Sequence, residues 1–165
     1  MSTVCELRIG RFVIHFLPRV KWTEEHFVLN TPPNSIALDG IVQGGPFLRE
    51  DTMHANFDHH SGVVREATMS TGMQVYFGIK GKMMQAFKGL IHIWVNDVDQ
   101  DTSLALWLII NHAKFEGIKS IPAISRLLGL TDQLDITGGS FPMLLDDGLM
   151  ARHCWVFEDY ADFRK

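Results

Sequence analysis

The sequence predicts an α/β fold in which a largely parallel sheet is flanked by helices. Short runs rich in β-branched and aromatic residues alternate with longer apolar stretches, and one example of each kind is well marked. Residues 90–97 (LIHIWVND) have the composition of a strand, and residues 101–117 (DTSLALWLIINHAKFEG) have that of a buried helix. Alternation of strands and helices favours a parallel sheet, whose sites collect at the carboxyl ends of the strands.

The first part of the chain is predicted to consist of strands and loops. Residues 4–18 are expected to form one or two strands that end at Pro18, and residues 21–35 a loop or a short helix. Short strands are expected within residues 35–40 and 54–57, and the segment between them is rich in turn residues.

The second part is predicted to be mainly helical. The T-x-x-Q pattern at 71–74 has the spacing of a capping box, which predicts a helix that starts there. Asp101 suits the N-cap of the helix at 101–117. A shorter helix with Pro122 in its first turn should follow, and residues 131–142 are expected to be turn-rich.

Length and composition predict one soluble, cytoplasmic domain over residues 1–165. A chain of 165 residues that is 46% hydrophobic can bury one sizeable core. The longest apolar run, LALWLII, is far shorter than the roughly 20 residues that cross a membrane, and the first residues lack the pattern of a signal peptide. The sequence leaves open whether the chain is a fragment of a longer protein.

Charge and cysteine content exclude some classes of protein. A net charge of −4 gives no global basic field of the kind that nucleic-acid-binding proteins carry. Cys5 and Cys154 do not form a C-x-x-C pair, so neither a disulfide framework nor a cysteine-type zinc site is expected, and a reducing compartment fits.

Aspartates follow the predicted strands. Asp39 ends IALDG, Asp58 ends ANFD before two histidines, and Asp97 and Asp99 follow IHIWVN. Residues two apart in extended chain point the same way, so Asp97 and Asp99 can face one point. A further residue, Asp135, lies just before a glycine pair. We therefore expect acidic side chains to gather at one edge of the sheet.

Such a cluster predicts a metal site. If these carboxylates converge with His59, they repel one another strongly unless cations balance their charge. Mixed oxygen and nitrogen ligands suit Mn²⁺, Mg²⁺, Zn²⁺ or Fe²⁺, and the excess of carboxylates favours Mn²⁺ or Mg²⁺, with two ions expected. Taken singly, each aspartate is better explained as a turn or helix cap, and the two histidines as a polar loop. Their coincidence favours the metal site.

Two stretches carry a resemblance to a known family. NFDHH, with a strand before it and Ser-Gly after it, resembles the signature of the DHH phosphoesterase superfamily, which includes single-strand exonucleases, exopolyphosphatases and manganese pyrophosphatases. IHIWVNDVDQDTSLALWLI is similar to the strand, D-x-D and helix motif of that family. The order is rearranged, because Asp-His-His precedes D-x-D here, and Gln100 replaces the glycine that follows D-x-D in the family.

The resemblance implies a DHH-like domain and a metal-dependent hydrolase. Such an enzyme would cleave a phosphate ester or phosphoanhydride with a water activated by two ions, and its substrate would be a small phosphorylated or nucleotide molecule. His60 would face the substrate phosphate and assist the leaving group. The resemblance also implies six metal ligands: Asp39, Asp58, His59, Asp97, Asp99 and Asp135.

Substrate contacts are expected near the start of the helix that follows the Asp-His-His motif. Arg65, Ser70 and Thr71 could hold a phosphate there, and the alternative is a capped helix with Arg65 paired to another group.

Two other functions stay open. The chain could be a catalytically impaired DHH-like module that binds a nucleotide or a protein, because the motif order is changed and little room is left for a second domain. It could also be a metal hydrolase that cleaves a bond other than a phosphate ester. No membrane partner is expected, and eleven Phe and four Trp residues leave room for a homodimer interface.

Overall fold

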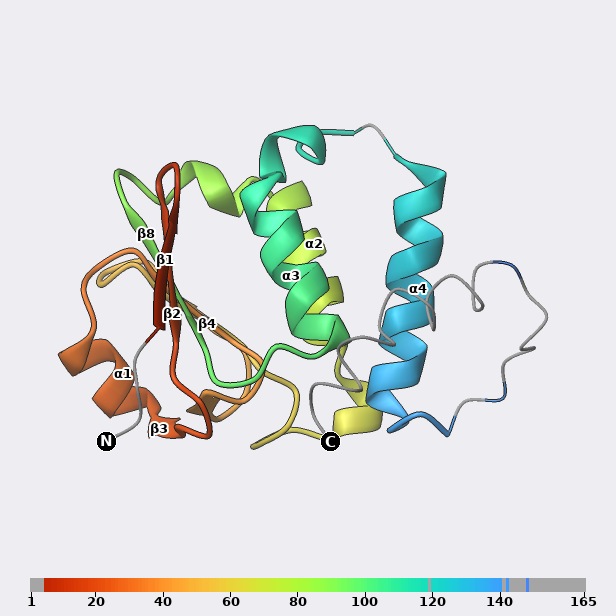
Figure 1. Cartoon of the computed structure of the whole chain (residues 1–165), viewed down its shortest axis with the longest axis horizontal. Coiled ribbons are helices and arrows are strands. Elements are labelled where there is room, and N and C mark those ends of the chain that lie inside the picture. Colours follow the sequence, from red (N-terminus) through yellow and green to blue (C-terminus); the bar gives the residue numbers. More distant parts are fainter. Residues whose placement is uncertain (1–4, 119, 141, 143–147, 149–165) are drawn as a thin grey trace.

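The computed structural model describes residues 5–118, 120–140, 142 and 148, and its fold is α/β (Figure 1). A six-stranded sheet has the order β1-β2-β8-β4-β7-β6. Its inner strands, which run parallel, are β2 (Phe12–Phe16), β8 (Ile91–Val95), β4 (Ser35–Leu38) and β7 (His54–Phe57). Its edge strands, which pair antiparallel to their neighbours, are β1 (Cys5–Ile9) and β6 (Phe47–Arg49). The sheet is therefore parallel in its interior and mixed as a whole.

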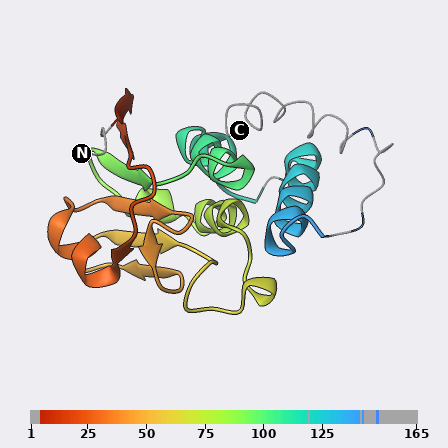
Figure 2. The same cartoon turned by 60° about the horizontal axis from the view of Figure 1, so that its bottom comes forward.

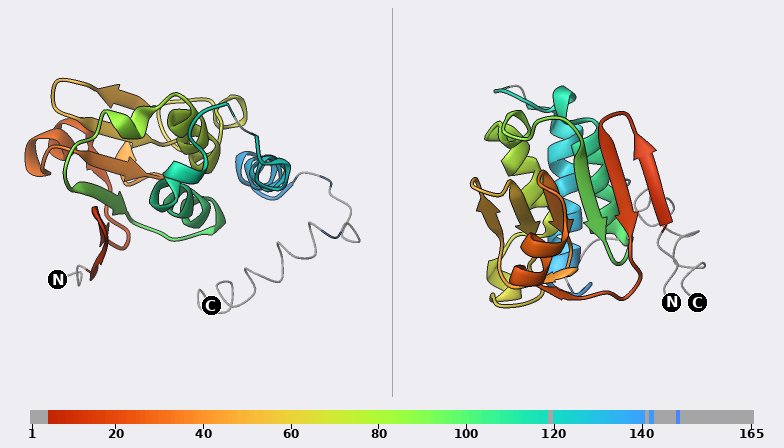
Figure 3. Two further views of the ribbon diagram at one scale, coloured as in Figure 1. Left: turned by 90° about the horizontal axis from the view of Figure 1, so that it is seen from above. Right: turned by 90° about the vertical axis from the view of Figure 1, so that its left-hand side faces the viewer.

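The helices cover the two faces of the sheet unequally (Figures 1 and 3). One face carries α1 (Glu24–Asn30) and the two-stranded pair of β3 (Trp22–Thr23) and β5 (Val42–Gln43). The other face carries α2 (Thr71–Lys80) and α3 (Gln100–Ile110), and α4 (Pro122–Ile136) packs on these two helices. Three short 3₁₀ helices complete the described part: η1 (Arg65–Ala67), η2 (Met83–Gln85) and η3 (His112–Lys114).

The central strand β4 is buried on both faces of the sheet. Ile36 and Leu38 belong to the larger core that α2 and α3 close, whereas Ala37 belongs to the smaller core around Phe27 of α1. This alternation follows from the two-residue period of an extended chain. A strand that lies between helices on both sides needs apolar residues on both faces, which explains the continuous run SIAL.

Helix starts differ from the sequence prediction. The N-cap of α2 is Ser70, because the hydroxyl of Thr71 donates instead to the carbonyl oxygen of Phe57 at 2.7 Å. The N-cap of α3 is Asp99, so the prediction that Asp101 caps this helix was wrong. Since α3 begins at Gln100, the side chain of Asp101 lies within the first turn of the helix and is buried.

The turn-rich segment predicted from residue 131 is helical as far as Ile136 (Figure 2). Leu128, Leu130 and Thr131 are buried where α4 packs on the rest of the molecule. Packing of this face outweighs the polar composition of the segment. The left-handed residues Gly138 and Gly139 follow and mark the end of the helix.

The structure bears on two expectations from composition, which concern membrane-spanning helices and the cysteines. Among the described residues, the helices are too short or too polar to cross a membrane. Cys5 is a free thiol exposed on edge strand β1, whereas Cys154 lies outside the described residues.

The topology brings three predicted strand ends side by side. Strands β7 and β8 flank β4, and the register pairs Leu38 with Phe57 and Ala37 with Trp94. The chain passes from β4 to β7 on one side and returns through α2 to β8 on the other, so β4 lies at a switch point in the strand order. Ligand sites form at such points, outside the carboxyl ends of the strands.

Replacement of Ile93 by alanine should test this packing. Ile93 is fully buried at the centre of β8, so we expect the free energy of unfolding to fall by about 2–5 kcal/mol in urea titrations. The control is Leu29→Ala, because Leu29 on α1 is 73% exposed and its loss should change stability by less than about 0.5 kcal/mol. Equal effects of the two changes would contradict the assigned core.

Candidate metal centre

Asp39 lies at the middle of the site, directly after β4. Its backbone is left-handed, with φ 50°, a conformation that aspartate tolerates better than most residues. Its amide donates to the carbonyl oxygen of Phe57 at 3.2 Å. Its carboxylate accepts from the hydroxyl of Thr102 at 2.8 Å, and the hydroxyl of Thr71, which donates mainly to Phe57, lies 3.4 Å away. The first turns of α2 and α3 therefore fix this buried carboxylate in place.

A first group of ligand atoms surrounds this carboxylate. The Oδ1 atom of Asp39 lies 3.2 Å from Nδ1 of His60 and 3.7 Å from Nε2 of His59. Ligand atoms of the three residues lie within 4.8 Å of one another. Asp39 and His59 are buried, and the side chain of His60 is 36% exposed. This group could hold a metal ion that remains open to solvent on one side.

A second group shares His59 and adds Asp101 and Asp135. The Nε2 atom of His59 lies 2.7 Å from Oδ2 of Asp135. One oxygen of Asp101 accepts from the amide of Gly72 at 3.0 Å, which leaves its other oxygen for a different partner. The group takes ligands from the loop after β7, from α3 and from α4.

Several buried atoms of the second group make no hydrogen bond within the described part of the chain. They are both ring nitrogens of His59 and the Oδ2 atoms of Asp101 and Asp135. Buried polar atoms in folded proteins almost always have a partner. Nε2 of His59 and Oδ2 of Asp135 lie 2.7 Å apart as an ion pair, which is close enough for both atoms to bind one ion. These residues therefore fit a metal ion.

The pKa shifts of the histidine and the aspartates indicate an excess of negative charge at the candidate centre. Burial lowers the pKa of His59, but Asp135 and Asp39 outweigh this effect and raise it to about 10. Burial and the charges of Asp135 and Asp39 raise the pKa of Asp101 well above its usual value. Burial and Asp39 raise the pKa of Asp99 to about 6. Without a cation, the centre therefore retains protons to reduce the repulsion.

Asp58 shapes the loop that carries the histidines. Its Oδ1 atom accepts from the backbone amide of His60 at 2.9 Å and lies 3.1 Å from Nδ1 of the same residue. Its Oδ2 atom accepts from the hydroxyl of Ser61 at 2.8 Å. Burial raises the pKa of Asp58, but these contacts from His60 and Ser61 outweigh burial and lower it. Neither candidate metal group includes Asp58, whose role as a ligand stays a prediction.

The acids after β8 are arranged differently from the sequence expectation. Asp97 Oδ1 accepts from the amide of Val98, and Asp99 caps α3 by accepting from the amide of Thr102 at 2.9 Å. Both line a cavity beside the centre, while Asp101 reaches the second group. The sequence did not predict that Asp101 is a candidate ligand. Asp97, Asp99 and Asp101 are spaced two residues apart and each suits a helix start, so the pattern does not show which one caps the helix.

Arg65 contacts a candidate ligand. Its Nη2 atom donates to the backbone oxygen of Asp135 at 2.9 Å and to the carboxylate at 3.1 Å. The amide of Ser70, at the start of α2, donates to the carboxylate of Asp132 at 2.7 Å. An acidic side chain of the protein thus already contacts the helix start where a phosphate was expected. The geometry gives Arg65 the role of orienting Asp135.

A cavity of about 390 Å³ opens beside the centre. Its volume falls within the range of small-molecule sites. The residues that line it are Arg19, Lys21, Asp39, Gly40, Gln43, His60, Ser61, Asn96, Asp97 and Asp99. His60 is thus the histidine of the motif that a molecule in the cavity can reach.

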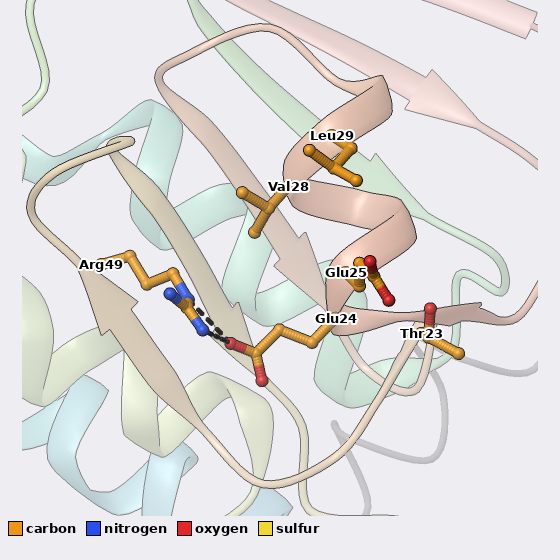
Figure 4. A pocket seen from close by; sticks show the side chains of 6 residues that line it. All are labelled: Thr23, Glu24, Glu25, Val28, Leu29 and Arg49. Carbon is orange, nitrogen blue, oxygen red and sulfur yellow. Dashed lines mark hydrogen bonds and ion pairs between the residues drawn. The ribbon is translucent and has the colours of Figure 1, made fainter.

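A larger cavity of about 510 Å³ beside α1 is a weaker candidate (Figure 4). Thr23, Glu24, Glu25, Val28, Leu29 and Arg49 line it. The guanidinium of Arg49 donates to the carboxylate of Glu24 at 2.7 Å, so its charge is already neutralised. Among the residues that the structure describes, its lining has no histidine, and it includes neither of the two ligand groups described above.

The charge excess predicts the behaviour of Asp101→Asn without metal. Asparagine keeps the acceptor for Gly72 and removes the buried acid, so the melting temperature should rise by about 3–6 °C at pH 7, or about 1.5 kcal/mol. The folded pKa of Asp101 is raised, so its stability contribution is lost as pH rises above about 4. The difference in melting temperature between Asp101→Asn and the native chain should therefore be smaller at pH 4 than at pH 7. Thermal unfolding in EDTA measures it.

The matched control is Asp51→Asn. Asp51 is exposed, and its carboxylate accepts from the amide of Thr52 just as that of Asp101 accepts from Gly72. We expect its melting temperature to stay within about 1 °C of the native value at both pH values. A destabilised Asp101→Asn protein at pH 7 would show that the buried charge is not repelled.

Comparison with protein-family models, with curated proteins and with solved structures found no match for this chain in any of the three. The resemblance to the DHH superfamily therefore rests on the motifs alone and stays an expectation.

Proposed function

We propose that this chain is a metal-dependent phosphoesterase. The observation that carries the proposal is that two candidate ligand groups share the buried His59, and that the first of them borders an open cavity through Asp39 and His60. Asp39 and Asp101 are buried, and buried carboxylates close to other acids destabilise a fold unless a positive charge binds there. Retention of such a cluster favours a function that uses the cation.

The ligand set favours Mn²⁺ or Mg²⁺. Taken together, the two groups contain three carboxylates and two imidazoles. Two ions are proposed, as the resemblance implies, and the imidazole of His59 would bind one of them. Divalent ions at such a centre lower the pKa of water and stabilise the charge on phosphoryl oxygens. Substrates would be phosphate esters or phosphoanhydrides small enough for the cavity.

The residues of the chain have separate tasks in this proposal. Although His60 borders the first ligand group, we assign it to the substrate and leave that ion to Asp39 and its neighbours. His60 lies at the cavity, where it can donate a hydrogen bond or a proton to the leaving oxygen. The hydrogen bond to Asp58 and the charge of Asp39 outweigh burial and raise the pKa of His60, which favours its protonated form. Thr71 and Thr102 hold Asp39, and Arg65 holds Asp135.

Removal of a central carboxylate should abolish activity. We expect the native chain to hydrolyse bis-p-nitrophenyl phosphate with Mn²⁺ and not with EDTA, and Asp39→Asn to lose at least about 100-fold of the rate. Asp51→Asn is the control and should keep the native rate. Mn²⁺-induced thermal stabilisation without hydrolysis of this diester or of a short oligonucleotide would favour the binding-module alternative.

Replacement of His60 by glutamine separates binding from turnover. His60 is half-buried at the cavity, while His59 is fully buried between the two groups. Turnover should therefore fall about 10²–10⁴-fold while Mn²⁺ still raises the melting temperature. Loss of the thermal shift together with turnover would assign His60 to the metal ligands and leave its proposed contact with substrate without support.

A further inference from the structure

The cavity beside the metal centre is lined by side chains of both charges. Its acidic lining, called the acidic wall below, consists of Asp39, Asp97 and Asp99, and Asp39 also belongs to the first ligand group. Arg19 and Lys21, from the connection between β2 and β3, provide the basic part of the lining. A cavity of this composition attracts a molecule with two separated charged groups once cations occupy the acidic wall.

The basic part is a well-anchored loop. The amide of Arg19 donates to the carbonyl oxygen of Asn96 at 3.3 Å, and the side chain of Asn96 donates back to the carbonyl oxygen of Val20 at 2.8 Å. The amide of Leu17 donates to Val95 at 2.9 Å. These bonds tie the loop to the end of β8, directly before Asp97. The position of the loop relative to the acidic wall is therefore fixed by hydrogen bonds of the loop backbone.

The backbone of Arg19 supports a functional role for its position. Its φ of 63° places it in the left-handed region, which residues with a long side chain rarely adopt. Strained backbone of this kind clusters at ligand sites, where the surrounding structure enforces it. Here the contacts to Asn96 enforce it.

The charges of the two residues are available to a ligand. Arg19 and Lys21 are exposed, and within the described residues neither side chain has an ion-pair partner. Arg65 and Arg49, in contrast, are paired with Asp135 and Glu24. A guanidinium and an ammonium that line the same cavity suit a phosphate or a carboxylate group.

We propose that Arg19 and Lys21 form a second anion subsite that selects phosphate esters carrying a further phosphate or carboxylate group. The inference rests on the proposed function, because the first phosphate needs cations at the acidic wall. The cavity of about 390 Å³ holds both groups only if a short linker joins them. The substrate class is therefore small bis-anionic phosphate esters.

A series of phosphonates that resist hydrolysis tests the subsite by binding alone. Propylphosphonate carries one anionic group, 3-phosphonopropanoate adds a carboxylate and propane-1,3-bisphosphonate adds a phosphonate. With Mn²⁺, isothermal titration should show about tenfold tighter binding of at least one bis-anionic ligand than of propylphosphonate. Preference for the bisphosphonate alone would assign the subsite to phosphate, and preference for both would assign it to either anion.

The Arg19→Gln/Lys21→Gln double variant should bind all three ligands within about twofold of one another. Both residues are exposed, so its melting temperature should stay native. Lys114→Gln is the control, because Lys114 lies in η3 and does not line the cavity. Its preference for bis-anionic ligands should match that of the native chain. Titration of each ligand into Mn²⁺ buffer without protein corrects for chelation of the ion by the ligand.

The outcomes for the subsite and for the proposed function are distinct. Equal affinities in the native chain, or a preference that the double variant keeps, would overturn the subsite even if bis-p-nitrophenyl phosphate is hydrolysed. A preference lost in the double variant would support the subsite even if no phosphate ester is hydrolysed, in which case only the phosphoesterase proposal fails.

Discussion

Repulsion among buried carboxylates is the constraint on which the rest of the structure depends. Asp39 and Asp101 are nearly inaccessible to solvent, and each is held by donors of the protein. The positive ends of α2 and α3 face them, since Gly72 and Thr102 lie in the first turns of these helices. A Cβ atom at position 72 would lie 2.8 Å from Asp101 Oδ1, so only glycine allows this close approach. The fold thus places hydrogen-bond donors of two helix starts next to the buried carboxylates.

The parallel sheet explains how distant residues reach one place. Because β7 and β8 flank β4, residues that follow three strands meet at one edge, and the helices that connect the strands begin there. The basic loop after β2 belongs to the same edge, because β2 runs parallel beside β8. Charges of both signs are therefore brought together by strand order alone.

The sequence predicted the sheet interior and the strand ends well, and the helix ends less well. Short apolar runs and the aspartates that follow them predicted β4, β7 and β8, and with them Asp39 and His59. Which aspartate caps α3 could not be predicted, because Asp99 and Asp101 are equally suitable N-cap residues. The contact between Arg65 and Asp135 depends on how α4 packs, which no local pattern encodes.

The position of Asp135 on α4 has a consequence for the energetics of the whole chain. The helix packs on α2 and α3, and two of its acids meet partners there: Asp132 meets Ser70, and Asp135 meets His59 and Arg65. An ion bound by His59 and Asp135 would bridge the sheet edge and this outer helix. Docking of α4 and ion binding would then be thermodynamically linked, so each would strengthen the other by the same free energy. The second group would be complete only when the outer helix is in place.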